Sequence, residues 1–392
     1  MLSGNMAKEL KSETRPLYIK RVERINPEKQ LTDALTERFG EKFTEYRKKY
    51  FKVLNSVNEN YNYVPDYPLN VLVEVVNKCN LECIMCLSSH RKGPTKVISQ
   101  DTITKLLKEF EENKLPALMF GAGEEPLMFT DIDKIWEGAN SAGIMDIFIF
   151  TNGTLLNKEM REKIFNHKVA RVYISLDAAT EETYAKVRLK NNDIEQDTTN
   201  NDKLKILEQD SNRLENIENN IKELIKLREE KGLQLPQIRV SYTVQHKNKH
   251  EIELFKNKWE NVVDFIEFQE TQNIQFDKIS KLSEKERWKR RPPMFEKNFK
   301  KDCKAPFHSA TIWADGSVIP CCTFQGKNLT LGNINGIPEL GIPPESLKEL
   351  WNGDKINELR EQFRTGELNI VCQSCLNARQ TDIWDEIDEI RK

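Results

Sequence analysis

The grouping of the cysteines is the feature of this 392-residue chain that most constrains its fold and chemistry. Three of the eight cysteines form one Cys-x3-Cys-x2-Cys triplet, and the other five follow more than two hundred residues later. In order they are Cys79, Cys83, Cys86, Cys303, Cys321, Cys322, Cys372 and Cys375. Thiolates are preferred ligands of iron–sulfur clusters and zinc, whereas cysteines used as small apolar residues would be scattered through the core. The grouping therefore predicts two metal sites.

A disulfide framework is the alternative use of so many cysteines, but such frameworks belong to oxidising compartments. Residues Met1–Ser12 are rich in Lys and Glu and lack the apolar stretch of a signal peptide. No apolar run approaches the roughly 20 residues that cross a bilayer. Sixty basic against 62 acidic residues give a net charge of -2, which creates no field to attract nucleic acid. We therefore expect a cytoplasmic protein with no nucleic-acid and no membrane partner.

Six short β-rich runs alternate with helical patterns along the middle of the chain. They are Val71–Val76, Ala117–Phe120, Asp146–Phe150, Val169–Leu176, Gln237–Val244 and Val262–Phe268. Strands that alternate with helices form βα units in a parallel sheet. Six such units predict an α/β fold with the architecture of a partial (β/α)6 barrel.

Two segments depart from this pattern. Residues 1–67 are highly charged, and a single helix with one apolar stripe is predicted to start at Asn26-Pro27. Residues 190–220 are dominated by polar and charged side chains and cannot bury enough apolar area to order on their own. We expect this segment to be a surface insertion, with a substrate lid as the alternative, and helical periodicity returns at Leu214.

The strand expected near Gln237–Gln245 has one apolar and one polar face. Its apolar residues are Ile238, Val240, Tyr242 and Val244, and they alternate with Arg239, Ser241, Thr243 and Gln245. This alternation predicts that the apolar set packs on outer helices while the polar set lines the interior, which implies a cavity. An edge strand with a solvated face is the alternative.

The first cysteine group directly follows the first predicted strand, so Cys79, Cys83 and Cys86 lie at that strand's carboxyl end, where α/β barrels keep their chemistry. Three cysteines can hold three irons of a [4Fe–4S] cluster and leave the fourth iron open for a ligand. Structural zinc needs a fourth protein ligand, and His90 is the only local candidate. The triplet therefore favours a cluster over zinc.

This Cys-x3-Cys-x2-Cys loop after a first barrel strand resembles the signature of radical S-adenosylmethionine (radical SAM) enzymes. In that superfamily the open iron binds the amino and carboxylate groups of SAM. The resemblance implies that an external donor of the flavodoxin or ferredoxin type reduces the cluster. It also implies that SAM is then cleaved to methionine and a 5′-deoxyadenosyl radical, which abstracts hydrogen from substrate.

The resemblance extends to the loops that follow the next strands. The segment Gly121–Pro126 resembles the Gly-Gly-Glu-Pro motif, whose backbone and acidic group receive the SAM ammonium. Glu124 stands in place of the second glycine, so either Glu124 or Glu125 can be that carboxylate, and we prefer Glu125 because it directly precedes Pro126. Met85 stands where many relatives have an aromatic residue beside adenine. The other SAM contacts implied by the resemblance are Gly121, Gly123, Asn152, Ser175, Asp177 and Arg188.

The second cysteine group resembles the C-terminal SPASM/twitch extension of radical SAM enzymes. The segment Trp313–Val318 predicts a β-hairpin with an Asp-Gly turn, and Cys372 and Cys375 form a Cys-x2-Cys pair. Together with Cys303 and Cys321 they supply four ligands, enough for one auxiliary [4Fe–4S] cluster. Cys322 is then a spare, which we expect to be a buried neighbour. A four-cysteine zinc ribbon is the alternative for this group.

The expected organisation is an N-terminal helical segment at 1–67, a radical SAM barrel at 68–285 and a SPASM/twitch domain at 286–392. The resemblance implies an oxidoreductase or isomerase. The polar cavity face favours a polar small-molecule substrate, of sugar or aminocyclitol type, over a ribosomally made peptide. An iron–sulfur electron-transfer or regulatory protein without turnover is the alternative of another class.

Overall fold

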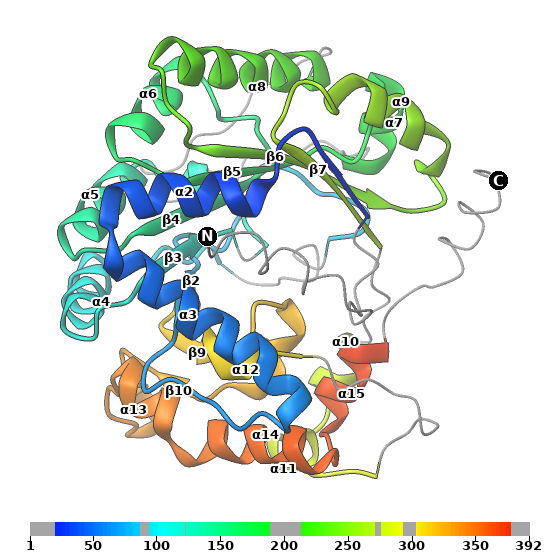
Figure 1. Cartoon of the computed structure of the whole chain (residues 1–392). Coiled ribbons are helices and arrows are strands. Elements are labelled where there is room, and N and C mark those ends of the chain that lie inside the picture. The colour runs from blue at the N-terminus through cyan, green and yellow to red at the C-terminus, as the bar shows by residue number, and fades with distance from the viewer. Residues whose placement is uncertain are drawn as a thin grey trace.

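The computed structural model describes residues 20–86, 94–121, 123–188, 213–270, 276–292 and 303–377. Figure 1 shows a curved sheet with helices along its outer side and a C-terminal layer of helices below it. The six predicted strands are present as β2 (Asn70–Val73), β3 (Ala117–Phe120), β4 (Asp146–Thr151), β5 (Arg171–Ser175), β6 (Gln237–Val244) and β7 (Phe265–Glu270). Each pairs in parallel with the next, and the sheet stays open, so the predicted partial (β/α)6 barrel is confirmed.

Helices connect the strands and cover the outer side of the sheet (Figure 1). They are α4 (Gln100–Glu112), α5 (Ile132–Ser141), α6 (Lys158–Asn166), α7 (Glu181–Arg188), α8 (Arg213–Glu230) and α9 (Ile252–Trp259), with short 3-10 turns η3 (Pro126–Met128) and η4 (Lys249–Glu251). Two of them start at residues that the sequence marks as caps, because Ser99 and Asn157 each accept a hydrogen bond from a backbone N–H three residues later. The outward side chains of the strands join these helices in the main apolar core.

β6 has the two faces that its sequence predicts. Outward-facing Tyr242 packs its ring 4.6 Å from that of Phe255 on α9. Inward-facing Arg239 places its guanidinium 4.0 Å from the ring centre of Tyr173. Because β6 lies between β5 and β7, the alternative of an edge strand is wrong.

The chain outside the barrel extends the sheet at both edges. At one edge β1 (Lys20–Glu23) pairs antiparallel with β7. The N-terminal segment therefore contains a strand, whereas the sequence predicted helix alone. At the other edge β8 (Ser309–Ile312) pairs in parallel with β2, followed by β9 (Ser317–Ile319) and β10 (Gly332–Asn333). The predicted hairpin is confirmed as β8–β9, closed by a hydrogen bond of 2.9 Å from Trp313 N to Ser317 O.

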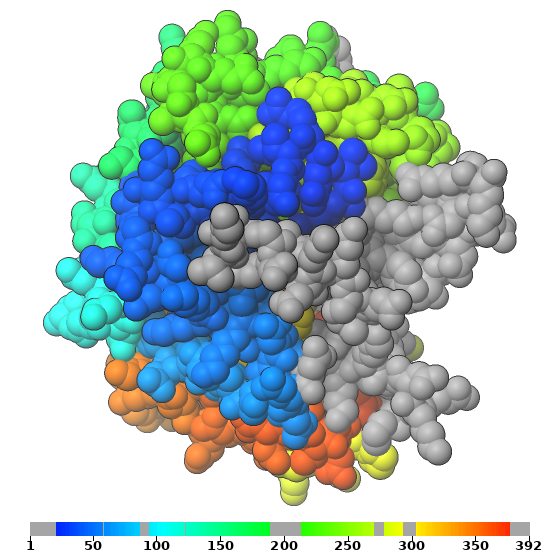
Figure 2. Space-filling view, in the orientation of Figure 1, coloured from blue at the N-terminus to red at the C-terminus, as the bar shows by residue number. Residues whose placement is uncertain are grey.

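The N-terminal segment forms two helices where the sequence predicted one. They are α2 (Pro27–Phe39) and α3 (Glu41–Ser56), followed by η1 (Val57–Glu59). Asn26 caps α2 as expected, and the helix ends because Gly40 adopts a φ of 59°, outside the right-handed helical region. Figure 2 shows these blue helices as a belt between the barrel and the orange C-terminal helices.

The C-terminal region packs against the segment that follows α3. Its elements are α10 (Phe276–Ser280), α11 (Glu284–Trp288), α12 (Ala305–His308), η5 (Phe324–Leu329), η6 (Pro338–Leu340), α13 (Leu347–Asn352), α14 (Asp354–Thr365) and α15 (Ile370–Asn377). The ring of Tyr61 stacks 4.4 Å from that of Phe307, and Trp351 Nε1 donates to Pro65 O at 2.8 Å. The segment after α3 therefore joins the barrel to the C-terminal elements.

The predicted insertion at 190–220 lies largely outside the described residues, as does His90. Its last part is helical, because α8 begins at Arg213, and Leu214 is buried as the periodicity predicts. Within the ranges given above, no helix has the length and apolar character needed to span a membrane.

Candidate active site and auxiliary metal site

The predicted cluster ligands Cys79, Cys83 and Cys86 lie on the loop that follows β2. Cys83 is buried and the other two are half-buried. Burial raises the pKa of the Cys79 and Cys83 thiols, and the nearby charges of other thiols raise it further. A buried group of neighbouring thiols favours the neutral form until a metal stabilises the thiolates, so these residues fit a metal cluster.

The loops after β3 and β4 are joined by the carboxylate of Glu125, which is 1% exposed. It accepts hydrogen bonds from Thr151 Oγ1 and Asn152 N, both at 2.7 Å, and from Leu127 N at 3.2 Å. Its own backbone N–H donates to Lys78 O, next to the first cysteine, at 3.0 Å. Burial raises the pKa of Glu125 to about 7 against the effect of these donors. Through these hydrogen bonds Glu125 connects the loops that follow β2, β3 and β4.

The side chain of Asn152 reaches the first cysteine. Its Nδ2 lies 3.7 Å from Cys79 Sγ and donates to Asn80 Oδ1 at 2.8 Å. Its Oδ1 accepts from the backbone N–H of Thr154 at 3.0 Å. Asn152 is therefore fixed by its neighbours with a donor directed at a predicted cluster ligand.

A buried ion pair supports the second cysteine. Arg188 Nη2 lies 2.7 Å from Asp177 Oδ2, and Arg188 Nη1 lies 3.5 Å from Cys83 Sγ. Asp177 has a φ of 58° and accepts from Thr243 N at 2.6 Å. The backbone N–H of Ile84 also donates to Val187 O at 3.0 Å. The structure thus brings Asp177 and Arg188 to the cluster loop, where the Arg188 guanidinium contacts the Cys83 thiol and Asp177 holds Arg188 in place.

The other predicted SAM contacts surround the same loops. Gly121 follows β3, and its backbone N–H donates to Glu124 Oε1 at 3.2 Å. Gly123 is exposed and Met85 and Ser175 are half-buried, whereas Pro126 is buried at the start of η3. All of them lie at the carboxyl ends of consecutive parallel strands, or on the loops that follow. Their contacts to SAM, including the preference for Glu125 over Glu124, stay predictions.

Sequence reasoning missed the residues that hold α7, the helix of Arg188. The carboxylate of Glu251 accepts from the backbone N–H of Ala179 at 2.7 Å and from Thr183 Oγ1 at 2.7 Å. Asn248 is 0% exposed, and its Nδ2 donates to Asp177 O at 2.9 Å. Both residues lie some seventy positions from their partners, so no local spacing in the sequence signals them.

The interior face of the sheet combines aromatic and charged side chains. Phe148, Tyr173, Phe265 and Trp313 belong to one buried cluster, separate from the main core. Arg239 lies over Tyr173 and forms an ion pair with Glu267 of β7. The predicted polar interior is thus present on β6 and β7, above an aromatic layer that the sequence analysis did not predict.

The second cysteine group assembles four thiols from three separate segments. The predicted ligands Cys303, Cys321, Cys372 and Cys375 are all half-buried. Burial raises the pKa of Cys303 and Cys372, and the charges of Cys321 and Cys375 raise it further for both. Four thiols near enough to affect one another fit a cluster. Cys322 is exposed, so the prediction that it is a buried neighbour is wrong.

Backbone and amide contacts fix this second group. Thr311 Oγ1 of β8 donates to Cys321 O at 2.9 Å, and Asn369 Nδ2 lies 3.6 Å from Cys372 Sγ. Because β8 pairs with β2 and β9 pairs with β8, the strands that precede Cys79 and Cys321 belong to one continuous sheet. Within the described parts of the chain, no three His, Cys, Asp or Glu side chains are arranged as ligands of a single ion.

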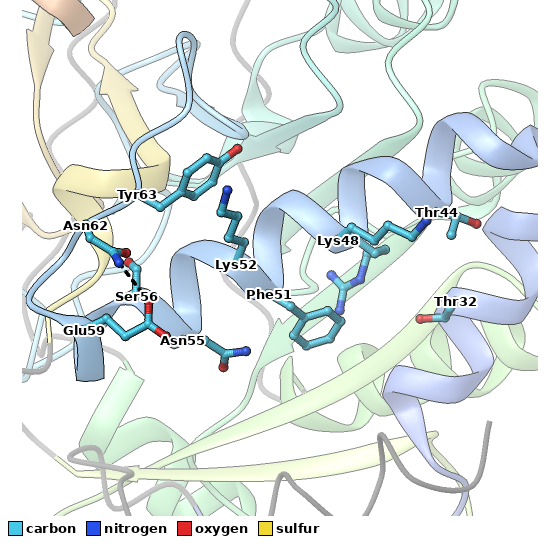
Figure 3. Close-up of a pocket in the computed structure, with 11 residues that line it drawn as sticks. Thr32, Thr44, Lys48, Phe51, Lys52, Asn55, Ser56, Glu59, Asn62 and Tyr63 are labelled. Carbon is cyan, nitrogen blue, oxygen red and sulfur yellow. Dashed lines mark hydrogen bonds between the residues drawn. The ribbon is translucent and has the colours of Figure 1, made fainter. Parts of the chain in front are cut away.

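A cavity of about 780 Å³ lies along α3 (Figure 3). Lys48, Phe51, Lys52 and Asn55 line it from α3, and Tyr63 lines it from the segment that follows. Its lining includes no cysteine and none of the predicted SAM contacts. We therefore place the candidate active site at the cysteine loop and the barrel interior rather than at this cavity.

Comparison with known protein families matches two regions of the chain. Residues 73–229 match the radical SAM superfamily, and residues 303–376 match the SPASM family, an iron–sulfur cluster-binding domain. The first region includes Cys79, Cys83 and Cys86, and the second includes every cysteine of the C-terminal group.

Curated relatives match the barrel region. A probable GTP 3′,8-cyclase of Methanococcus maripaludis is 34% identical over 124 residues, which is 31% of this chain and 40% of the relative. A GTP 3′,8-cyclase of Lactiplantibacillus plantarum is 30% identical over 138 residues, 34% of this chain and 40% of the relative. The chain thus spans about two fifths of the length of these relatives.

A solved structure supports the fold over most of the chain. The structure of anSMEcpe with bound AdoMet aligns with a TM-score of 0.50 and 15% sequence identity. The alignment covers 82% of this chain and 96% of that one. At this identity the likeness concerns the fold alone.

Proposed function

Because this chain is a radical SAM enzyme with a C-terminal SPASM domain, we propose that it cleaves SAM at the Cys79/Cys83/Cys86 site and removes hydrogen from a polar small molecule. One observation carries this assignment. Side chains from the segments that follow β3, β4 and β5 are hydrogen-bonded to one another or to the cysteine loop after β2, because Glu125 binds Asn152, Asn152 reaches Cys79 and Arg188 reaches Cys83. An electron-transfer protein needs a cluster but does not need polar side chains from several strand loops arranged beside it.

SAM and [4Fe–4S] clusters are the cofactors of this enzyme. When bound and reduced, the first cluster supplies the electron that breaks the sulfur–C5′ bond of SAM and starts hydrogen abstraction. The residues of the chain bind and orient. Asn152 and Arg188 direct donors at Cys79 and Cys83 and so stabilise the negative charge of the thiolates. Glu125 supplies a buried carboxylate for the ammonium group of SAM.

The interior of the barrel supports a polar small molecule as substrate. Arg239, Ser241 and Glu267 are buried on its inner face, above aromatic rings that exclude water. The curated relatives are named after the nucleotide GTP, which is a polar small molecule. We therefore extend the proposed substrate class from sugars and aminocyclitols to nucleotides. A ribosomally made peptide is the second candidate.

We propose that Cys303, Cys321, Cys372 and Cys375 hold one auxiliary [4Fe–4S] cluster. Four protein ligands would leave no iron open for substrate, so a cluster held by these residues would serve electron transfer. Acceptance of the electron left on the substrate radical would give a two-electron oxidation, and relay of electrons without net oxidation of the substrate would be compatible with an epimerisation. An electron donor of flavodoxin or ferredoxin type is the partner proposed for the first cluster.

The test of the first site is release of 5′-deoxyadenosine by anaerobically reconstituted protein with dithionite and SAM. The parental protein is expected to release it, and a variant with alanine at Cys79, Cys83 and Cys86 is expected to release none. Cys322→Ala is the matched control, because this exposed cysteine is outside both ligand sets, and it should keep parental release. If the triple variant released as much 5′-deoxyadenosine as the parental protein, the assignment of these cysteines to SAM cleavage would be wrong. If the folded parental protein released none, the electron-transfer alternative would be favoured.

The auxiliary site is tested by iron content and product. Two clusters require about eight irons per chain, and Cys375→Ala is expected to keep roughly half of them. This variant should still cleave SAM but form no oxidised product. Circular dichroism must match the parental protein, because loss of a metal site can unfold the segment around it. Stoichiometric zinc at the second site would show a ribbon instead.

A further inference from the structure

Two arginines inside the barrel share a single carboxylate. Arg239 of β6 pairs with Glu267 Oε2, and Arg21 of β1 lies 3.3 Å from Glu267 Oε1. Gln269 Nε2 also donates to Glu267 Oε2, at 3.0 Å. The carboxylate is therefore occupied by three donors. Among the residues that the structure describes, the two arginines and one glutamate of this group leave one positive charge uncompensated.

This group also contains hydrogen-bonding atoms that lack partners. Arg239 Nε, Arg21 Nε and Ser241 Oγ are buried and have no hydrogen-bond partner in the part of the chain that the structure describes. Arg239 is 7% exposed and Ser241 is 3% exposed. A buried polar atom without a partner is unfavourable, so several such atoms on one interior face indicate a missing ligand.

The position of these atoms suits a substrate. Ser241 lies two residues before Thr243, whose backbone N–H binds Asp177 beside the cluster loop. At about 3.3 Å per residue, the group begins about 7 Å along the strand from that loop. Phe150 and Ser175, on the same inner face, are half-buried although they belong to central strands. The interior is thus accessible between the cluster loop and the aromatic layer.

A second arginine on this inner face provides a comparison. Arg171 of β5 pairs with Asp146 through two parallel hydrogen bonds, one of them from Nε to Oδ1 at 3.0 Å. That pair is balanced one to one at the amino end of the strands. At Glu267, by contrast, one carboxylate faces two guanidinium groups, those of Arg239 and Arg21. Burial lowers the pKa of Arg239, and the charge of Arg21 lowers it further against the opposing charge of Glu267.

We propose that Arg239, Arg21 and Ser241 form a subsite for an anionic group of the substrate, a carboxylate or a phosphate. The subsite anchors this group while the rest of the molecule extends toward SAM. This assignment rests on the proposed function, because it names the class of substrate for the same active site. Glu267 orients both arginines and at the same time weakens their attraction for the anion.

The test measures equilibrium binding of three hexoses to anaerobic, cluster-loaded enzyme with SAM by dialysis. D-glucose 6-phosphate and D-glucuronate present a phosphate and a carboxylate, and D-glucose is the neutral control. We expect one of the anionic sugars to bind. The sugar that binds shows whether the subsite takes a phosphate or a carboxylate. Arg239→Gln should weaken that binding about tenfold to a hundredfold, as expected for loss of a buried charge-assisted hydrogen bond.

Glu267→Gln gives the decisive comparison, because it should strengthen anion binding severalfold while Arg239→Gln weakens it. A purely structural ion pair would make both variants bind less. Arg38→Gln, which removes an arginine from the exposed end of α2, is the matched control and should bind as the parental enzyme does. If Arg239→Gln does not fold, Ser241→Ala replaces it and should weaken binding by a smaller factor.

Two results would overturn the subsite. One is that D-glucose binds as tightly as both anionic sugars, and the other is that Arg239→Gln and Glu267→Gln change binding in the same direction. Release of 5′-deoxyadenosine by the parental enzyme is measured on the same samples. Release without selective anion binding removes the subsite alone, whereas absence of release removes the proposed function.

Discussion

Replacing Gly121 with alanine tests whether the loop after β3 must approach β4 as closely as observed. Gly121 has a φ of 103°, and a Cβ there would lie 2.6 Å from the carbonyl oxygen of Phe150. Phe150 belongs to β4, which is held by β3 on one side and β5 on the other. The loop must therefore move instead of the strand. Because the loop carries Glu125, the movement also disturbs Asn152.

The size of the effect follows from two separate costs. An L-residue with positive φ loses about 1–2 kcal/mol, and overpacking a close contact adds about 1–3 kcal/mol. Gly143 supplies the control, because its φ is 78° and its Cβ would have no atom within 4 Å. Gly143→Ala should show only the first cost. The difference in unfolding free energy between the two variants is then about 1–3 kcal/mol.

The assay compares urea unfolding of both variants by circular dichroism and their affinity for SAM by anaerobic equilibrium binding. Gly121→Ala should unfold at lower urea concentration than Gly143→Ala and should bind SAM more weakly. If the whole steric cost of about 1–3 kcal/mol displaces the loop that binds SAM, the affinity for SAM falls roughly 5- to 150-fold. Equal stability and equal affinity of the two variants would refute the steric reasoning.

Three further predictions concern the metal sites and the buried carboxylates. Gly326→Ala would place a Cβ 2.5 Å from Cys321 Sγ, so iron analysis should show loss of about half the iron while SAM cleavage persists. The pKa of Glu125 is raised to about 7 in the folded protein. As pH rises, the unfolded chain therefore loses the Glu125 proton at lower pH than the folded protein does. Stability should then fall by up to about 3 kcal/mol between pH 4.5 and 7, and urea unfolding should show no such slope for Glu125→Gln. Asp177→Asn leaves the buried Arg188 without its counter-charge and should cost about 3–5 kcal/mol. Thermal unfolding should show a smaller loss in cluster-loaded than in apo protein, because a thiolate near Arg188 replaces part of the charge.

The strands and the cysteine loop are predictable from the sequence because their signals are local. A βα unit is specified by the alternation of short apolar runs with helical periodicity, and all six strands formed where those runs lie. Parallel strands place their carboxyl ends at one edge, so the loops bearing Cys79, Glu125, Asn152 and Asp177 had to meet there. The helix break at Gly40 was missed because a stripe of apolar residues continues across it.

The supports of the site were decided by tertiary structure. Glu251 binds the start of α7 from 68 positions away, and Arg21 reaches Glu267 across 246 positions. Such contacts depend on which strand takes each edge of the sheet, and β1 reached its edge without a sequence pattern that marked it as a strand. The exposure of Cys322 beside the half-buried Cys321 also follows from the packing of its neighbours.

The sequence by itself determined the family of this protein and the prediction of its cluster loop, because ligand type and local spacing mark such a loop wherever it is placed. Only the folded chain decided the charge balance of the interior. Arg239 and Glu267 come from neighbouring strands and Arg21 from the far N-terminal strand. Whether two arginines share one carboxylate, or each has its own as Arg171 has Asp146, depends on register and on which edges pair. Those are properties of the whole sheet, which no segment of the sequence contains.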